Sequence, residues 1–437
     1  SSGKHVSLWI IDYQLMKQRD RNKKVRRRYL QHCQNAIQIQ QKISHRNILK
    51  IIEYDSAGKK FGFVSEKVSY SLSNEKKYSR DEAMYITQQL AITLDYLHEN
   101  HKLVFLGLCP DNVFLNPNFT LKLGLFLHST PYQSDIAPVQ HPFMPWQPNS
   151  IYFIPANYCA PEIVNGSQPV TVNVDTYMYA LLVIYVFTGR PPSQATGASD
   201  LDASLPLAAC QELPEEYSSL LKSCLNIVPA SRPSFQTIIN DEAFSSLVCV
   251  IFKYLEQILT KEPKDLFNFF SWLKKYIDVF SFRIIRQKIM PIFIYYIRKD
   301  VRYGIALLPM VLKIHKKFDD KQFLEEIATP LRPIFNITEP QVIPGIFVDH
   351  LAIFINRLPP QKYEEFVYPI ILNALKINSK PVVEKVLRVL PHIVSIMSTE
   401  LLKTELVPTM KKVIEAIISP DNANSFIEIL ILTMKKT

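Results

Sequence analysis

Six cysteine side chains are the first candidates for metal or redox chemistry in this chain. No two of them have the Cys-x-x-Cys spacing of a zinc or redox site, and no cluster of histidines accompanies them. We therefore expect no metal and no cofactor, and scattered thiols are typical of a reducing compartment such as the cytosol. The cysteines are Cys33, Cys109, Cys159, Cys210, Cys224 and Cys249.

Four short motifs follow one another in the first half of the chain. In this order and spacing they resemble the landmarks of the protein kinase fold: the end of the activation segment, the start of the central helix, the turn after that helix, and an arginine motif further on. The likeness covers about residues 4 to 245. The motifs are Ala160-Pro161-Glu162, Asp175-Thr176-Tyr177, Thr188-Gly189-Arg190 and Ser231-Arg232-Pro233.

The charged residues of these motifs have structural roles in the family that the motifs resemble. The resemblance implies a buried ion pair between Glu162 and Arg232, and it implies that Asp175 accepts backbone N–H groups of the catalytic loop. Removing one partner of a buried ion pair costs about 3–5 kcal/mol, because it leaves the other charge buried and unpaired. These three residues stabilise the lobe and transfer no phosphate.

The residues that transfer phosphate in protein kinases are missing at the matching positions. The family uses a lysine, a helix glutamate, a catalytic aspartate with a nearby lysine, and a magnesium-binding aspartate. Asn112 alone is retained, and we favour a role for it in holding the loop. Nearby Lys102 and Lys122 could replace a cation but not a magnesium ligand. The matching positions, in chain order, hold Trp9, Ala36, Gly107, Cys109 and Leu125.

The second half of the chain reads as consecutive helices with a repeat. Four prolines, each followed by an apolar helical pattern, lie 39 residues apart, and we expect each to open a helix because proline fits the first helical turn. Further prolines at 309, 344 and 391 are expected to open the second helix of each pair. A helix pair of about 40 residues is typical of HEAT or armadillo solenoids. The repeated prolines are Pro291, Pro330, Pro369 and Pro408.

These patterns predict two domains. Residues 1–246 should form an α+β kinase-like domain with a truncated N-lobe, and residues 247–437 an all-α HEAT-like solenoid. With 47% hydrophobic and 21% charged residues, the composition is that of a globular protein. The most apolar run, 179–187, is shorter than the ~20 residues of a membrane span. We expect a soluble protein that is at most peripheral to a membrane.

A degraded kinase domain followed by HEAT-type repeats resembles the Scy-like family of pseudokinases. Segments such as Leu108-Cys109-Pro110-Asp111-Asn112, Leu331-Arg332-Pro333-Ile334-Phe335 and Tyr368-Pro369-Ile370-Ile371 resemble its coated-vesicle-associated branch. The resemblance implies an inactive scaffold or adaptor, not an enzyme, that binds vesicle coat, adaptor or other trafficking proteins. It also implies a cytoplasmic protein found on Golgi, endosomal or coated-vesicle membranes.

Other interpretations remain open. An atypical, weakly active kinase is one, and it depends on Asn112. The net charge of +10 suits anionic partners, and the basic run 17–28 is either a solvated helix face or a patch for anionic membranes or RNA. Nucleic-acid binding is disfavoured because no RNA-recognition, zinc-finger or helix-turn-helix motif occurs. The proline-rich segment 131–161 is expected to cover the empty cleft with Phe143 and Trp146.

Overall fold

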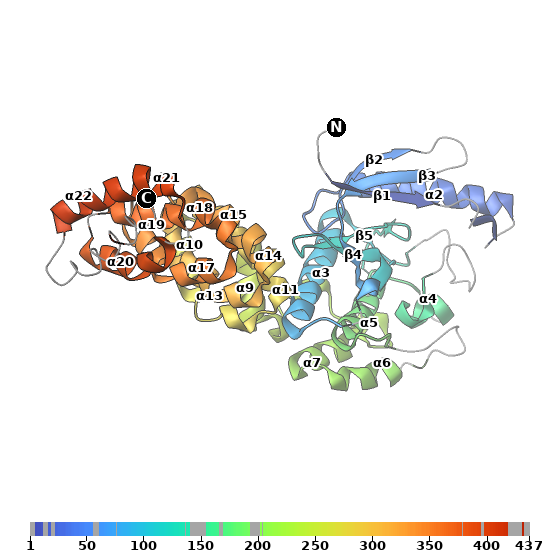
Figure 1. Cartoon of the computed structure of the whole chain (residues 1–437). Helices are drawn as coiled ribbons and strands as arrows, with labels where there is room; N and C mark the ends of the chain where they lie inside the picture. The colour runs from blue at the N-terminus through green and yellow to red at the C-terminus, as the bar shows by residue number, and fades with distance from the viewer. Residues whose placement is uncertain are drawn as a thin grey trace. The chain divides into compact units, whose positions relative to one another are not determined.

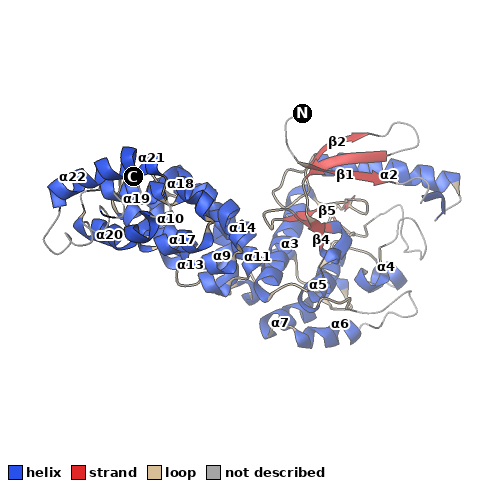
Figure 2. Cartoon of the chain, in the orientation of Figure 1, coloured by secondary structure: helices blue, strands red, loops and turns tan. Residues whose placement is uncertain are grey.

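The computed structural model describes most of the chain and separates into two compact units, Ser1–Thr260 and Lys261–Thr437. In the described residues the first unit mixes strands with helices, whereas the second is helical (Figures 1 and 2). The described residues are 5–11, 16–18, 22–55, 61–75, 77–135, 137–139, 154–165, 169–192, 202, 204–377, 379–394, 397–417 and 431.

The first unit begins with a small antiparallel sheet packed on one long helix. The sheet has the order β1 (Val6–Ile11), β3 (Phe61–Glu66), β2 (Ile51–Asp55). Alternate side chains of β3 are buried, which is the period-two pattern of a sheet with one covered face. Helix α2 (Lys23–Gln41) supplies that cover, and Asn22 caps it by accepting the N–H of Lys24.

The rest of the first unit is mainly helical. Its central helix α5 is buried on nearly every side, as a mostly apolar helix in the middle of a lobe must be. This unit also contains two short sheets. Strand β5 pairs with β8, and β4, β6 and β7 form a three-stranded sheet in that order. The helices are α3 (Arg80–His101), α4 (Pro161–Asn165), α5 (Val174–Thr188), α6 (Ser204–Ala209), α7 (Glu215–Cys224), α8 (Phe235–Ile239) and α9 (Leu247–Glu256); the strands are β4 (Tyr70–Ser71), β5 (Leu103–Val104), β6 (Val113–Leu115), β7 (Leu121–Leu123) and β8 (Thr130–Pro131).

Helix α9 lies beyond the predicted boundary at residue 246, yet it belongs to the first unit by its contacts. The Glu256 carboxylate accepts a hydrogen bond from the Tyr85 hydroxyl at 2.9 Å and pairs with the Arg46 guanidinium at 2.9 Å. Gln88 donates its side-chain amide to the carbonyl oxygen of Cys249 at 3.3 Å. These contacts explain why the first compact unit ends at Thr260 rather than at residue 246.

In the second unit the helices stack in two layers. One layer contains α12, α15, α19 and α22, and the other contains α10, α13, α16 and α20, with contacts both along and between the layers. This is the stacking by which solenoid repeats bury apolar faces jointly. The helices are α10 (Pro263–Leu273), α11 (Phe282–Ile284), α12 (Met290–Lys299), α13 (Gly304–Ile314), α14 (Asp320–Gln322), α15 (Thr329–Leu331), α16 (Val342–Asp349), α17 (Leu351–Arg357), α18 (Tyr363–Phe366), α19 (Tyr368–Lys376), α20 (Lys380–Val394), α21 (Thr399–Leu401) and α22 (Val407–Ile417).

The four prolines of the 39-residue register lie in the first turn of α12, α15, α19 and α22, as the sequence predicts. Three of these segments are nevertheless continuations of helices that start earlier, because π-helical residues precede the proline. Proline lacks an N–H and its ring crowds the preceding turn, and a π segment with i→i+5 bonding accommodates both defects. The π segments are Ile285–Ile289, Phe323–Ala328 and Leu402–Leu406.

The prediction for the intermediate prolines was correct only at Pro344, in the first turn of α16. Pro309 and Pro391 lie inside α13 and α20 and do not open them. Helix α13 starts at Gly304 because a 3₁₀ turn capped by Asp300 directly precedes it. The fold class, an α+β unit followed by a helical solenoid, is confirmed.

Candidate functional site

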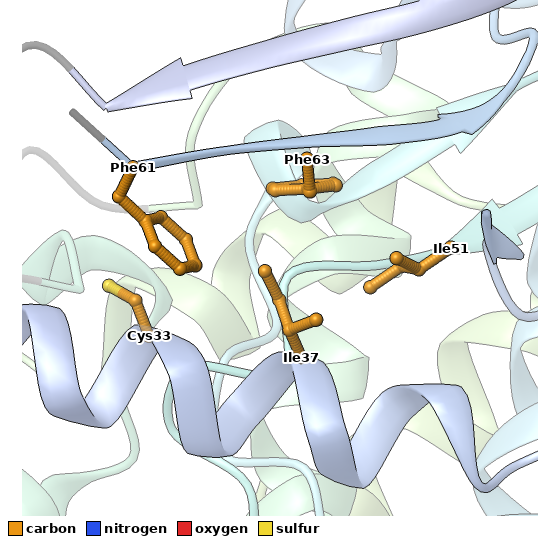
Figure 3. Close-up of a cluster of buried hydrophobic side chains, with 5 residues drawn as sticks. All are labelled: Cys33, Ile37, Ile51, Phe61 and Phe63. Atoms are coloured by element: carbon orange, nitrogen blue, oxygen red, sulfur yellow. The ribbon is translucent and has the colours of Figure 1, made fainter. Parts of the chain in front are cut away.

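The candidate site lies where α2 faces the small sheet. A cluster of buried side chains joins the two: Cys33 and Ile37 from α2, Ile51 from β2, and Phe61 and Phe63 from β3 (Figure 3). The figure shows the helix side chains directed at the phenylalanines across the gap. Burial raises the pKa of the Cys33 thiol to about 12, so this cysteine acts as a small apolar residue.

Trp9 stands at the position that the kinase resemblance matches to the phosphate-binding lysine, and its indole makes three contacts. Its ring stacks on Phe63 at a centroid distance of 5.5 Å and meets Phe114 edge-on at 5.0 Å. The indole N–H donates to the Ser65 hydroxyl at 2.8 Å. An aromatic ring with its single donor satisfied offers no cation to a phosphate.

A cavity of about 220 Å³ opens beside the indole, between α2, β1, β3 and residues 125–127. Trp9, Ala36 and Leu125 all line it, so the structure brings together three of the five degenerate positions. The described residues around this cavity include no Lys, Arg, Asp, Glu or His. The described lining is thus apolar, whereas triphosphates and divalent cations are held by charged or oxygen-rich partners.

The loop that resembles the kinase catalytic loop is held by a buried carboxylate of the central helix. Asp175, fully buried, accepts the N–H groups of Phe105 at 2.7 Å and Leu106 at 2.8 Å, together with a hydrogen bond from His98 at 2.9 Å. Phe105 in turn packs edge-on against Phe126 at 5.2 Å. The central helix thus holds this loop through a carboxylate that is unavailable to any substrate.

The other two degenerate positions lie within the loop itself. Asn112 donates its side-chain amide to the carbonyl oxygen of Gly107 at 2.7 Å. Cys109 is buried, and burial, reinforced by the nearby Asp111 charge, raises the pKa of its thiol to about 12. A thiol that stays protonated is neither a nucleophile nor a metal ligand.

Leu125 has a left-handed backbone conformation, which is unusual for a leucine. Its φ is 57°, and the φ of Leu106 is 55°, both in the left-handed region that disfavours L side chains by roughly 1–2 kcal/mol. Neither leucine has a side-chain oxygen that could exploit the conformation. Both leucines therefore adopt an unfavourable backbone geometry without a polar side chain that would benefit from it.

Glu162 and Arg232 form the ion pair that the motifs predict. The contact is bidentate, at 2.5 Å and 2.9 Å, and both side chains are buried. Arg232 also donates to the carbonyl oxygens of Asn226 and Asn173, at 2.8 Å and 3.2 Å. Every polar group of the pair is thereby engaged in fixing the lobe.

Neither of the two candidate rescue lysines reaches the cavity wall. Lys122 is buried, bonds the carbonyl oxygen of Arg46 at 2.6 Å and pairs with Glu66 at 2.9 Å. Lys102 pairs with Glu99 at the surface, at 3.2 Å. The buried Lys122–Glu66 pair was missed from the sequence, since a lysine between two leucines in a short strand gives no sign of its partner.

The basic run has the character of a helix surface. Its basic residues from Lys23 onwards lie in the first turns of α2 and are exposed, apart from Arg26, which is buried. Phe143 and Trp146, predicted to cover the cleft, lie outside the described residues. Within the described part of the chain, no group of three or more His, Cys, Asp or Glu side chains could hold a metal ion, and no helix is long and apolar enough to cross a membrane.

Comparison with known proteins agrees with this geometry. The protein kinase domain model matches residues 12–244. Human SCY1-like protein 2 is 25% identical over 345 residues, covering 76% of this chain and 37% of the human protein. This alignment is longer than the kinase match, so the similarity continues into the helical unit.

Two fungal proteins are also similar. The protein kinase-like protein SCY1 of Saccharomyces cerevisiae is 22% identical over 289 residues, which is 57% of this chain and 35% of the yeast protein. The protein kinase domain-containing protein ppk32 of Schizosaccharomyces pombe is 24% identical over 198 residues, 45% of this chain and 26% of that protein. The chain spans about a third of the length of these relatives or less. The chain belongs to the protein kinase domain family, and within it is homologous to the SCY1-like proteins.

Proposed function

We propose that this chain is a catalytically inactive kinase-like scaffold. The observation that carries the proposal is the apolar cavity that Trp9, Ala36 and Leu125 line together. In an active kinase these positions supply the lysine, the glutamate that holds it, and the magnesium-binding aspartate. Here they supply an indole, a methyl group and an isobutyl group, none of which stabilises phosphate charge.

The loop geometry supports the same conclusion from a second direction. Gly107 stands at the position of the catalytic aspartate and has no side chain that could accept the proton of a substrate hydroxyl. Asn112, on which the weakly active alternative depends, uses its amide to bond the carbonyl oxygen of Gly107. The retained charged contacts, those of Asp175 and of Glu162 with Arg232, stabilise the lobe as a rigid module.

A rigid module joined to a solenoid is suited to binding proteins. Stacked helix pairs expose long surfaces that carry no chemistry of their own and serve as platforms for partners. The homology to SCY1-like proteins extends over both units and supports this role. We extend the proposal to membrane traffic at Golgi, endosomal or coated-vesicle membranes, with vesicle coat or adaptor proteins as partners, on the strength of the branch resemblance.

Nucleotide binding provides the direct test of inactivity. A ligand at 100 times its dissociation constant stabilises a protein by about 2.7 kcal/mol, which raises the melting temperature by several degrees. We expect millimolar Mg-ATP to leave the melting temperature of the full chain unchanged, with an active kinase as positive control. We also expect no transfer of radiolabelled phosphate. Magnesium-dependent transfer that disappears in Asn112→Ala would instead establish the weakly active kinase.

The trafficking part of the proposal is tested separately. Endogenous-level, tagged full-length chain should co-fractionate with coated vesicles on a density gradient and label coat or adaptor proteins in a proximity-labelling experiment. Recovery in the membrane-free fractions alone, with no coat or adaptor protein labelled, would contradict this location without bearing on catalytic inactivity.

A further inference from the structure

A groove of about 720 Å³ lies on the second unit between α12 and the helix of the next repeat. Its apolar lining, here called the floor, consists of Met290, Pro291 and Ile294 from one repeat and Pro330 from the next. Pro291 and Pro330 are equivalent prolines of the 39-residue register, and a π segment precedes each of them. Segments of π-helix are frequent at functional sites, and a cavity of this size is typical of a ligand pocket.

The rim of the groove is cationic. Arg298 and Lys299 are exposed at the end of α12, and the Lys299 ammonium lies 5.9 Å from the ring centroid of Tyr295, itself 49% exposed. Arg286 also lines the groove and makes a bidentate pair with Glu326, with contacts of 2.9 Å and 2.5 Å. The lining therefore combines three cations with one carboxylate, and that carboxylate is already neutralised.

The segment that carries α12 is basic. Residues 261–317 contain thirteen Lys and Arg against four Asp and Glu, a net charge of +9. Of these residues, Arg286, Arg298 and Lys299 line the groove. Cations at a binding surface attract anionic partners and accelerate their association.

We propose that this groove binds a short acidic peptide segment of a partner protein. A bulky apolar side chain of the peptide lies on the floor made by Pro291, Ile294 and Pro330, and flanking carboxylates face Arg298 and Lys299. The proposal rests on the scaffold function above and names the chemistry of one partner. Peptide recognition of this kind combines an apolar anchor with a charged rim.

The apolar floor favours a peptide over other anions. A nucleic acid would place its charged backbone over a surface that offers it no hydrogen bonds, and a bilayer surface is too flat to enter a concave groove. Both would be attracted to Arg298 and Lys299 by charge alone. An apolar anchor in the peptide would be recognised only by the groove, so dependence on the anchor separates a peptide site from general electrostatic attraction.

The test measures fluorescence anisotropy of labelled twelve-residue peptides with the full chain. Three probes share a central Leu-Phe pair with flanks of Glu, Gln or Lys, and a fourth has Glu flanks around Ala-Ala. We expect the Glu peptide with Leu-Phe to bind at least about tenfold more tightly than each of the other three. Equal binding of the Ala-Ala peptide would overturn the proposal, because the floor would then play no part.

Matched variants localise the binding. Arg298→Glu with Lys299→Glu should weaken the Glu peptide with Leu-Phe at least about tenfold, and Tyr295→Ser should weaken it several-fold. Lys274→Glu with Lys275→Glu makes the same charge change at exposed residues outside the groove and should change affinity by less than about twofold. Equal losses in both double variants would overturn the assignment to the groove.

Two further probes address the competing anions. Poly-uridine RNA and vesicles containing phosphatidylserine should bind no more tightly than the Glu peptide with Ala-Ala. If either binds more tightly than the Leu-Phe peptide and loses binding in Arg298→Glu with Lys299→Glu, the surface serves that anion and the peptide proposal is wrong. None of these measurements involves nucleotide, so their failure leaves the proposal of an inactive kinase cleft untouched.

Discussion

Asn112 donates its side-chain amide to the carbonyl oxygen of Gly107 across 2.7 Å. By the kinase resemblance, Asn112 is the retained member of the catalytic set and Gly107 stands at the position of the catalytic aspartate. The backbone N–H of Gly124 also bonds the carbonyl oxygen of Asn112 at 3.1 Å. An asparagine bonded in this way ties the loop to the segment that leads to Leu125, which is a structural task.

Replacing Asn112 should accordingly affect stability. Asn112→Ala leaves the Gly107 carbonyl without this donor, and we expect a loss of about 1–2 kcal/mol in the free energy of unfolding, measured by urea denaturation. Asn118→Ala, at an exposed site nearby, is the control and should change stability by less than about 0.5 kcal/mol. An unchanged midpoint in Asn112→Ala would show that the amide contributes nothing to the fold.

Glu162 and Arg232 form a buried ion pair, so the effects of substituting them on the free energy of unfolding should not be additive. Glu162→Met or Arg232→Met alone should lower the free energy of unfolding by about 3–5 kcal/mol, because each leaves a buried charge unpaired. The double variant should be less destabilised than the sum of the two single variants. A double-mutant cycle in urea measures this coupling, and a sum that is simply additive would mean that the two charges do not interact.

Helix α3 ends at Lys102, which adopts a left-handed conformation with a φ of 48°. Glycine adopts this conformation without steric penalty, so Lys102→Gly should stabilise the protein by about 0.5–1 kcal/mol. The matched control is Lys42→Gly at the end of α2, where φ is −78° and glycine should destabilise by a similar amount. Thermal melting of the two variants should move in opposite directions, and a shift of the same sign in both would refute the argument.

Protonation of His45 should contribute to the unfolding of the protein in acid. Burial, assisted by the Arg46 and Lys122 charges, lowers the pKa of His45 from 6.5 to about 4. The folded protein therefore binds this proton less readily than the unfolded chain. The contribution to stability is complete above pH 6.5 and is lost as the pH falls through 4.

A hydrogen bond also opposes protonation of His45. Its Nδ1 accepts the N–H of Asn47 at 3.2 Å, and a protonated Nδ1 could not accept it. His45→Asn keeps a side-chain acceptor at that place but removes the titration. The variant should take up less proton than the parent on unfolding near pH 5, and its stability should vary less with pH between 6.5 and 4. Identical proton uptake would show that His45 does not titrate differently in the two states.

The cleft could be anticipated from the sequence because its positions are fixed by motifs. Glu162, Arg232 and Asp175 form the contacts that the motifs predict, and Trp9, Ala36 and Leu125 line one cavity. These positions could be found because the kinase motifs follow one another at characteristic distances along the chain. No comparable motif marks the Lys122–Glu66 pair or the Arg46–Glu256 contact, because their partners come from segments that are distant in sequence and irregular in pattern.

The solenoid could be predicted as a repeat but not in detail. The spacing of Pro291, Pro330, Pro369 and Pro408 gives the period correctly. It does not show that helices begin before three of these prolines, because proline is acceptable both at a helix start and after a π segment. The excess of Lys and Arg in residues 261–317 is visible in the sequence. Only the structure shows that some of these residues line a groove between two repeats.

All six cysteines belong to the first unit, and burial raises the pKa of each of their thiols. Protected thiols react with alkylating reagents only when the surrounding structure opens. Pulsed alkylation followed by mass spectrometry would therefore follow the opening of the kinase-like unit in the intact chain, site by site. The helical unit contains no cysteine and would give no alkylation signal. The cysteines therefore distinguish the unfolding of the first unit from that of the second.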